Sequence, residues 1–428
     1  MKPSDGIARA LIESNSGSDC FDTTDPFEAE KLSSMIKTQW AGLVQVALSL
    51  DSVSVVRNDT VTRLQRVPEM VYIRTPRGAA YSFEVNGRSY IVVDDHLIRL
   101  VHRFTRLAQE WGGSPIATAG HFDELMAERL YLRGNYHYSA TTAASWLRYG
   151  HPNNDFAPQE DVKAAADRAF FQVAFIITHE LAHLFLKCLP EDALNVFDEQ
   201  LRKHVLLGGS LRTLDDLTAV GLVDEFARDD VMRTECMCDA LSLASSLSVG
   251  GELRDVLRGA VDGLYLLQLL TVADMVADVL SARDGLGHEG LRAQARQYPF
   301  RKGSLLFLLG SFIYRMTNWG LGQPAIRIES DVQDSIAKHQ NLVRALVDHQ
   351  PAEAQRQHWD QVMAGQAKAD DLDLMAVDAA QDRELAKTMI GFRAPMIDNI
   401  KDHPRFLDMS KKNELLQNFM KRNPGYGS

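Results

Sequence analysis

Residues 170–189 read FFQVAFIITHELAHLFLKCL, and this apolar stretch decides the fold around it. No proline or glycine occurs from residue 161 to residue 189, while Pro158 and Pro190 stand on either side. We therefore expect one helix over 161–189. Apolar side chains cover nearly every side of that helix, which predicts that it is buried.

Three ionisable residues interrupt this apolar run and form an HExxH pattern: His179, Glu180 and His183. Side chains four residues apart share one face of a helix, so the two histidines can bind one zinc ion. Glu180 points about 100° round the helix and can accept a proton from a water that zinc polarises. A polar notch packed against other polar groups is the alternative, but burying these groups without a metal or partners costs several kcal/mol. We predict a zinc site.

A catalytic zinc site needs a third protein ligand, and a later segment offers one. We expect a helix over 222–248, on which Glu235 and Asp239 are four residues apart and therefore share a face. Glu235 can bind the metal while Asp239 accepts the remaining ring N–H of a zinc-binding histidine. The sequence thus predicts a ligand set of His179, His183 and Glu235.

Other donors stand near Glu235 in the sequence. Glu225 lies on the same predicted helix but faces roughly 80° away from Glu235, so the two cannot both bind one ion. Cys236 and Cys238 lack a C-x-x-C partner, and we interpret them as small buried residues. Glu235 is preferred, with Glu225 left as an alternative.

The clearest strand signal precedes the motif helix. A hairpin is expected over 81–93, because Asn86-Gly87 is the pair that most favours a tight hairpin turn, and a third short strand is expected at 71–74. Pairing about the turn places Phe83 opposite Tyr90 and gives the hairpin one mostly apolar face. The other face is mostly polar, with Ser82, Glu84 and Ser89 beside the apolar Ile91.

The combination of the HExxH helix with a later E-x-x-x-D helix resembles the gluzincin side of the zincin metallopeptidases. The resemblance implies peptide-bond hydrolysis with Zn²⁺ as cofactor. It implies that His179, His183 and Glu235 bind the metal, that Glu180 is the general base, and that Asp239 supports a ligand from the second shell.

Some features limit this resemblance. Metzincins would carry glycine at position 186 and histidine at position 189, but both positions are leucine, which excludes that class. The long gap before Glu235, and an insertion between the hairpin and the motif helix, depart from the best-known gluzincins. They leave the subfamily unassigned.

Zincins usually add a Tyr, His or Arg that stabilises the developing negative charge. Candidates lie in the insertion and around a glycine-rich turn: Tyr136, His137, Tyr138, His288, Tyr298 and Arg301. A turn with a surface arginine is an equally good interpretation of the second group. A peptide substrate is expected to add to an exposed edge of the sheet, and which strand forms that edge stays open.

Composition narrows the class of protein. The chain has 428 residues, a formal net charge of -11 and four cysteines. This charge argues against a protein that coats nucleic acid or an anionic membrane, and so few cysteines argue against a disulfide framework. Residues 1–25 lack the apolar core of a secretory signal, and no uninterrupted apolar run approaches ~18 residues. We expect a cytoplasmic protein without a membrane span.

The expected fold class is α+β, mostly α-helical, with a small antiparallel sheet packed on a zincin-type active-site helix pair and a helical C-terminal region. We expect a flexible tail over 1–25, a zincin-like catalytic region over 26–250, and a helical region over 251–428 that gates access or selects one protein substrate.

The preferred function is an intracellular zinc metallopeptidase acting on a protein or peptide. The alternative is a catalytically silent zincin scaffold that binds a partner through its helical C-terminal half. A third hypothesis is hydrolysis of a non-peptide amide. An intact Glu180 argues against the silent scaffold, because a structural metal site has no use for a base.

Overall fold

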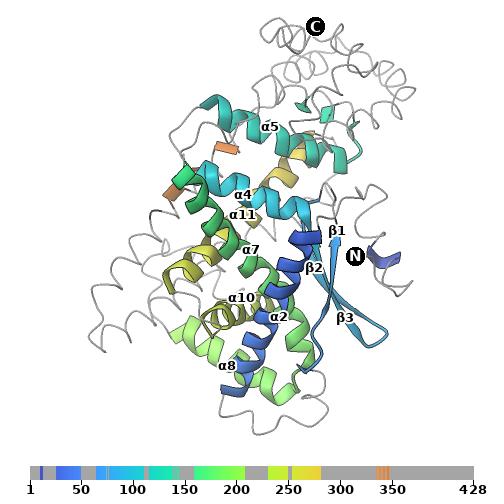
Figure 1. Ribbon diagram of the computed structural model, residues 1–428, viewed down its shortest axis with the longest axis vertical. Coiled ribbons are helices and arrows are strands. Elements are labelled where there is room, and N and C mark those ends of the chain that lie inside the picture. The colour runs from blue at the N-terminus through green and yellow to red at the C-terminus, as the bar shows by residue number, and fades with distance from the viewer. Residues whose placement is uncertain are drawn as a thin grey trace, which may run out of the picture. The chain divides into compact units, whose positions relative to one another are not determined.

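The computed structural model describes only part of the 428-residue chain. The described residues are 10–12, 26–49, 64–73, 75, 77–109, 115–136, 138–139, 142–143, 159–207, 230–248, 253–280 and seven positions between 334 and 346. Within these ranges the protein is mostly helical and has one small three-stranded sheet, as an α+β chain requires (Figure 1).

The chain divides into two compact units that are discontinuous in sequence. Unit 1 comprises residues 1–109, 163–268 and 293–340, and unit 2 comprises 110–162, 269–292 and 341–428. The expected domain division near residue 250 stays a prediction. Most of the expected N-terminal tail, and most of the region beyond residue 280, lie outside the described residues.

The sheet contains β1 (Glu69–Ile73), β2 (Ala80–Val85) and β3 (Arg88–Asp94) in the order β1-β3-β2. The predicted hairpin register is confirmed, because Phe83 pairs with Tyr90 in the antiparallel β2–β3 ladder. Asn86 and Gly87 both have positive φ at the turn, as a type I′ turn requires. The prediction of an antiparallel sheet is wrong, because β1 pairs with β3 in parallel and the sheet is mixed.

Asp94, at the end of β3, explains this strand order. Its buried carboxylate accepts hydrogen bonds from the backbone N–H groups of Thr75 (3.0 Å), His96 (2.9 Å) and Gly78 (3.3 Å), and from the Thr75 hydroxyl. The connection from β1 to β2 is therefore tied across the end of β3, which leaves β3 between the two other strands. Burial raises the pKa of Asp94, and the charge of His96 and these hydrogen bonds lower it in part.

The two faces of the sheet have different neighbours. On the apolar face Val71, Tyr90 and Val92 form a buried cluster with Ile12. The opposite face of β3 is buried as well, since Ile91 and Val93 have no exposed surface. This second face also carries the predicted polar side chains of the hairpin.

The motif helix is α7 (Gln159–Cys188), and it forms the core of unit 1. Nearly all of its side chains from Val173 to Leu186 are buried, which confirms the prediction of a buried apolar helix. Three other helices of the unit are α2 (Pro26–Ser49), α4 (Asp95–Gln109) and α10 (Asp230–Ser248), and α10 lies within the helix expected over 222–248. A fourth, α8 (Glu191–Leu207), was not expected.

Helix α10 packs along α2, and α2 in turn contacts α7 (Figure 1). The hydroxyl of Ser245 donates to the backbone oxygen of Gln39 at 2.8 Å, and both residues are buried. The rings of Trp40 and Phe185 meet edge to face at 6.1 Å. These contacts hold α10 at a fixed position within unit 1.

In unit 2, α5 (Pro115–Leu132) is followed by a turn that contacts the end of α11 (Leu253–Leu280). Arg133 donates to the Asp274 carboxylate at 2.5 Å and to its backbone oxygen at 3.3 Å. Two helical segments, Arg168–Cys188 and Arg254–Ala277, are long and apolar enough to cross a membrane, but most of each is buried within the protein. The absence of a membrane span stays a prediction.

In unit 1, α11 approaches the backbone of α7 closely at a glycine. A Cβ built on Gly259 would lie 2.5 Å from Phe171 Cβ and 2.7 Å from the Phe171 carbonyl carbon. One turn later, a Cβ on Gly263 would lie 3.1 Å from Phe175 Cδ1, an atom of a side-chain ring. Gly259 therefore sets the distance between α7 and α11, whereas position 263 tolerates a Cβ more easily.

We expect Gly259→Ala to lower the free energy of unfolding by about 1–3 kcal/mol, because the new methyl group overlaps backbone atoms that cannot rotate away. Gly263→Ala is the matched control, since a gain of about 1 kcal/mol in helix propensity offsets a mild side-chain contact. Urea unfolding of both variants beside the wild type measures the difference. Equal stability of the two variants would contradict the close approach at Gly259.

Candidate metal centre

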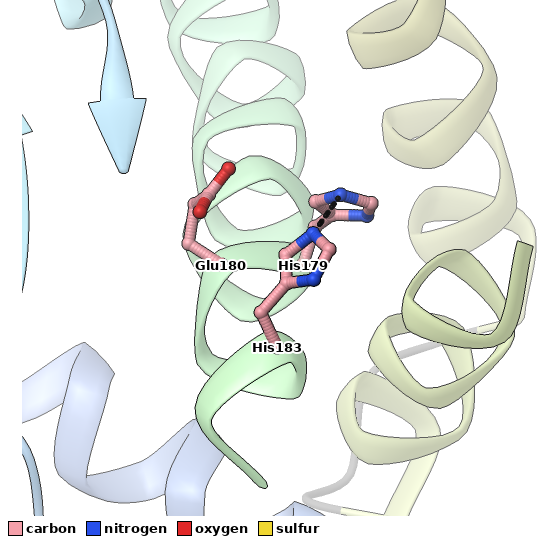
Figure 2. A group of neighbouring side chains, drawn as sticks. All are labelled: His179, Glu180 and His183. Carbon is pink, nitrogen blue, oxygen red and sulfur yellow. Dashed lines mark hydrogen bonds between the residues drawn. The ribbon is translucent and has the colours of Figure 1, made fainter. Parts of the chain in front are cut away.

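The candidate ligands come from two neighbouring helices of unit 1. His179 and His183 lie one turn apart on α7, and their rings project to the same side of that helix (Figure 2). The two Nε2 atoms are 3.2 Å apart. The buried α7 backbone, with His179 itself buried, fixes this arrangement.

Glu235 of α10 brings its carboxylate to both rings. Its Oε2 is 3.1 Å from His179 Nε2, and its Oε1 is 3.3 Å from His183 Nε2. Donors at the corners of a tetrahedral zinc site, with bonds of about 2.0–2.1 Å, are separated by about 3.3 Å. The spacing of these three donor groups therefore fits one zinc ion.

Asp239 determines which nitrogen of His179 carries the proton. The Asp239 Oδ1 atom is 2.8 Å from His179 Nδ1, and the aspartate side chain is only 2% exposed. This contact assigns the proton to Nδ1, so the lone pair of Nε2 faces His183 and Glu235. Carboxylate–histidine contacts of this kind orient and strengthen metal ligands in proteins.

The contacts within this group need one more proton or a bound cation. With Nδ1 protonated, the neutral His179 ring turns an Nε2 lone pair toward a carboxylate oxygen, and two acceptors at 3.1 Å repel each other. A proton shared between the ring and the Glu235 carboxyl group, or a bound cation, removes this repulsion. A divalent ion satisfies both histidines and the carboxylate together, whereas a proton bridges only two atoms.

Glu180 lies beside this donor set and points away from it, toward the sheet (Figure 2). Its Oε2 accepts a hydrogen bond of 3.3 Å from the Ser82 hydroxyl on β2. Burial raises the pKa of Glu180, the two histidines lower it, Glu235 raises it, and the Ser82 hydrogen bond lowers it.

Glu180 competes with Glu235 for the role of third ligand. Candidate ligand atoms of His179, Glu180 and His183 lie within 4.8 Å of one another. Glu235 is the better third ligand, because its oxygens are only 3.1 and 3.3 Å from the two ring nitrogens. Glu180 remains close enough to act on a molecule bound at the ion.

The structure describes only some of the other residues singled out from the sequence. Tyr136 and Tyr138 are partly buried and belong to unit 2, and burial raises the pKa of Tyr138. Cys236 and Cys238 are buried in α10, as expected. Five candidates lie outside the described residues: His137, Glu225, His288, Tyr298 and Arg301.

Ser82 is the site residue that the sequence interpretation missed. The signal was present, because the hairpin register groups Ser82 with Glu84 and Ser89 on one polar face of the sheet. Polar side chains on a face that covers an apolar helix need a polar partner on that helix. Between Val173 and Leu186, the polar residues are Thr178, which donates to the Ala174 backbone oxygen of its own helix, and the three residues of the motif.

No family model, curated protein or solved structure matches this chain. The roles of the site residues are therefore argued from the geometry of unit 1.

We expect the purified chain to bind about one zinc ion, because three donors converge at tetrahedral spacing. Asp239→Asn should weaken zinc binding about 10–100-fold, because an amide cannot stabilise the Nδ1 proton as a carboxylate does. Competition with a chromophoric chelator measures both values. Asp192→Asn, which removes an exposed carboxylate at the start of α8, is the matched control and should leave the affinity unchanged. A chain that binds no zinc, or an Asp239→Asn variant equal to the control, would contradict this assignment.

Proposed function

We propose that this protein is a zinc-dependent hydrolase that cleaves peptide bonds in a protein or peptide substrate, with Glu180 as the general base. The observation that carries the proposal is the position of Glu180. It lies next to two converging histidines, outside the closer donor set, and hydrogen-bonds a neutral hydroxyl. A group in that position can exchange protons with a reactant bound between the rings and the sheet.

When bound, zinc supplies a Lewis acid that polarises the scissile carbonyl and lowers the pKa of a water to about 7. The chain supplies the proton transfers. Glu180 takes a proton from the attacking water, the oxygen forms a bond to the carbonyl carbon, and Glu180 then delivers that proton to the leaving nitrogen as the C–N bond breaks. Glu180 ends ionised, so it is regenerated in each cycle.

The environment of Glu180 suits both transfers. Burial raises its pKa, which makes the carboxylate a stronger base than an exposed glutamate. The same shift moves the pKa of Glu180 toward neutral pH, where one carboxyl group can both accept and deliver a proton. The two histidines and the hydrogen bond from Ser82 oppose the shift.

The position of β2 favours a peptide over a non-peptide amide. Among the described strands, β2 is an edge, because β3 occupies the middle of the sheet. In a hairpin with a two-residue turn, the two residues that flank the turn exchange backbone hydrogen bonds. Along the strands from there, non-hydrogen-bonded and hydrogen-bonded residue pairs alternate. In this register Ser82 is in a non-hydrogen-bonded pair, so its N–H and C=O point to the open edge. An extended peptide can pair there, beside the general base.

The silent-scaffold alternative gains less support from these contacts. A metal site that only braces two helices needs its ligands and the groups that orient them. It does not need a further carboxylate that is close to the ion and loses hydration by its burial. Glu180 is such a carboxylate, and its presence is explained by proton transfer.

We expect Glu180→Gln to lower cleavage by about 10²–10⁴-fold while the chain keeps its zinc, because the amide has nearly the same shape but cannot accept the proton. Cleavage is measured by mass spectrometry on a random-sequence peptide mixture, with zinc content measured in parallel.

Glu191→Gln, at an exposed position of α8, is the matched control and should cleave like the wild type. Full activity of Glu180→Gln would overturn the role of the base. A zinc-loaded wild type that cleaves no peptide in the mixture would favour the scaffold alternative.

A further inference from the structure

We propose that Ser82 positions the general base, and this inference rests on the function proposed above. Among the described residues, the Ser82 hydroxyl is the hydrogen-bond donor to Glu180, at 3.3 Å from Oε2. It reaches Glu180 from 98 positions earlier in the chain, on a different layer of unit 1. Ser82 therefore joins the sheet to the reacting group of the motif helix.

A glutamate side chain needs such a partner to hold one orientation. It has three rotatable bonds, and fixing a side chain of this length costs up to about 2 kcal/mol of rotamer entropy. The histidines on the same helix do not fix it, because they project toward α10 while Glu180 projects toward the sheet (Figure 2). The hydrogen bond holds Oε2 toward β2 and leaves Oε1 to exchange protons.

Serine is chemically suited to this position because its hydroxyl is a neutral donor. It donates to Oε2 of the ionised carboxylate, and it keeps donating to that oxygen after Oε1 takes up a proton, because Oε2 is then the carbonyl oxygen of the acid. The same residue can therefore hold Glu180 before and after the first proton transfer. A threonine also has a hydroxyl donor, whereas an alanine has none.

The backbone around Ser82 is well placed to act as a fixed support. Ser82 lies opposite the fully buried Ile91, and its neighbours Tyr81 and Phe83 pair with Val92 and Tyr90. The Phe83 and Tyr90 rings stack at 5.2 Å. These contacts fix the strand backbone, so the Ser82 hydroxyl stays in one position and holds the Glu180 carboxylate there.

The test compares three variants of the full chain loaded with zinc. Ser82→Ala removes the hydroxyl, Ser82→Thr keeps it, and Ser89→Ala is the matched control. Ser89 lies on β3 and on the same face as Ser82, because it pairs with Glu84, which is two positions from Ser82 along β2. Zinc content and urea unfolding are measured for each variant. These measurements distinguish a loss of activity caused by a misplaced Glu180 from one caused by a loss of stability or of zinc.

On peptides that the wild type cleaves, we expect Ser82→Ala to lower kcat about threefold to tenfold, as loss of one hydrogen bond with an O···O distance of 3.3 Å implies. KM and zinc content should stay within about twofold of the wild type, since the hydroxyl holds the base and not the substrate or metal. Ser82→Thr should recover most of kcat, and Ser89→Ala should keep all of it.

A crystal structure of zinc-loaded Ser82→Ala gives a readout that needs no substrate. We expect the Glu180 carboxylate in more than one orientation, against one orientation in the wild type and in Ser89→Ala. One unchanged orientation in Ser82→Ala would overturn the inference, as would a kcat equal to that of Ser89→Ala. If Glu180→Gln keeps full activity, the proposed function itself fails, and that outcome is distinct from either of these.

Discussion

The contact between Asp239 and His179 is the interaction on which the candidate site depends. It places a proton on Nδ1 of a buried imidazole and thereby turns the Nε2 lone pair toward His183 and Glu235. Without it the ring is free to present an N–H to the carboxylate, and the group becomes an ordinary chain of hydrogen bonds. The site thus needs α7 and α10 at a fixed separation, which the close packing of unit 1 provides.

Much of this site follows from the sequence because the rules involved are local. An interval of four residues places His179 and His183 on one face of a helix, and the same interval places Glu235 and Asp239 together. These local rules do not determine whether the two helix faces meet, because that depends on α2 and on the packing of the core. The hairpin register is also local, since the turn residues and the alternation of side chains set it without help from the rest of the chain.

The features that the sequence interpretation missed depend on distant residues. The order of the strands follows from the Asp94 carboxylate, whose partners on the β1–β2 connection, Thr75 and Gly78, are sixteen or more positions away, and no local sequence pattern predicts that contact. The role of Ser82 depends on a residue 98 positions away. Helix α8 was also missed, but its start could have been predicted from nearby residues, because Pro190 is followed by acidic residues in the first turn.

Charge in the site distinguishes a catalytic centre from a brace between helices. Glu180, Glu235 and Asp239 bring three carboxylates to two imidazoles, and a divalent ion offsets the charge of two of them. The charge that is left belongs to Glu180, whose partner Ser82 is neutral. A protein that used the ion only to join α7 to α10 would be as stable or more stable with an uncharged residue at position 180. An uncompensated carboxylate beside a metal site is costly for folding and useful for moving protons, and that imbalance is the physical reason for proposing an enzyme.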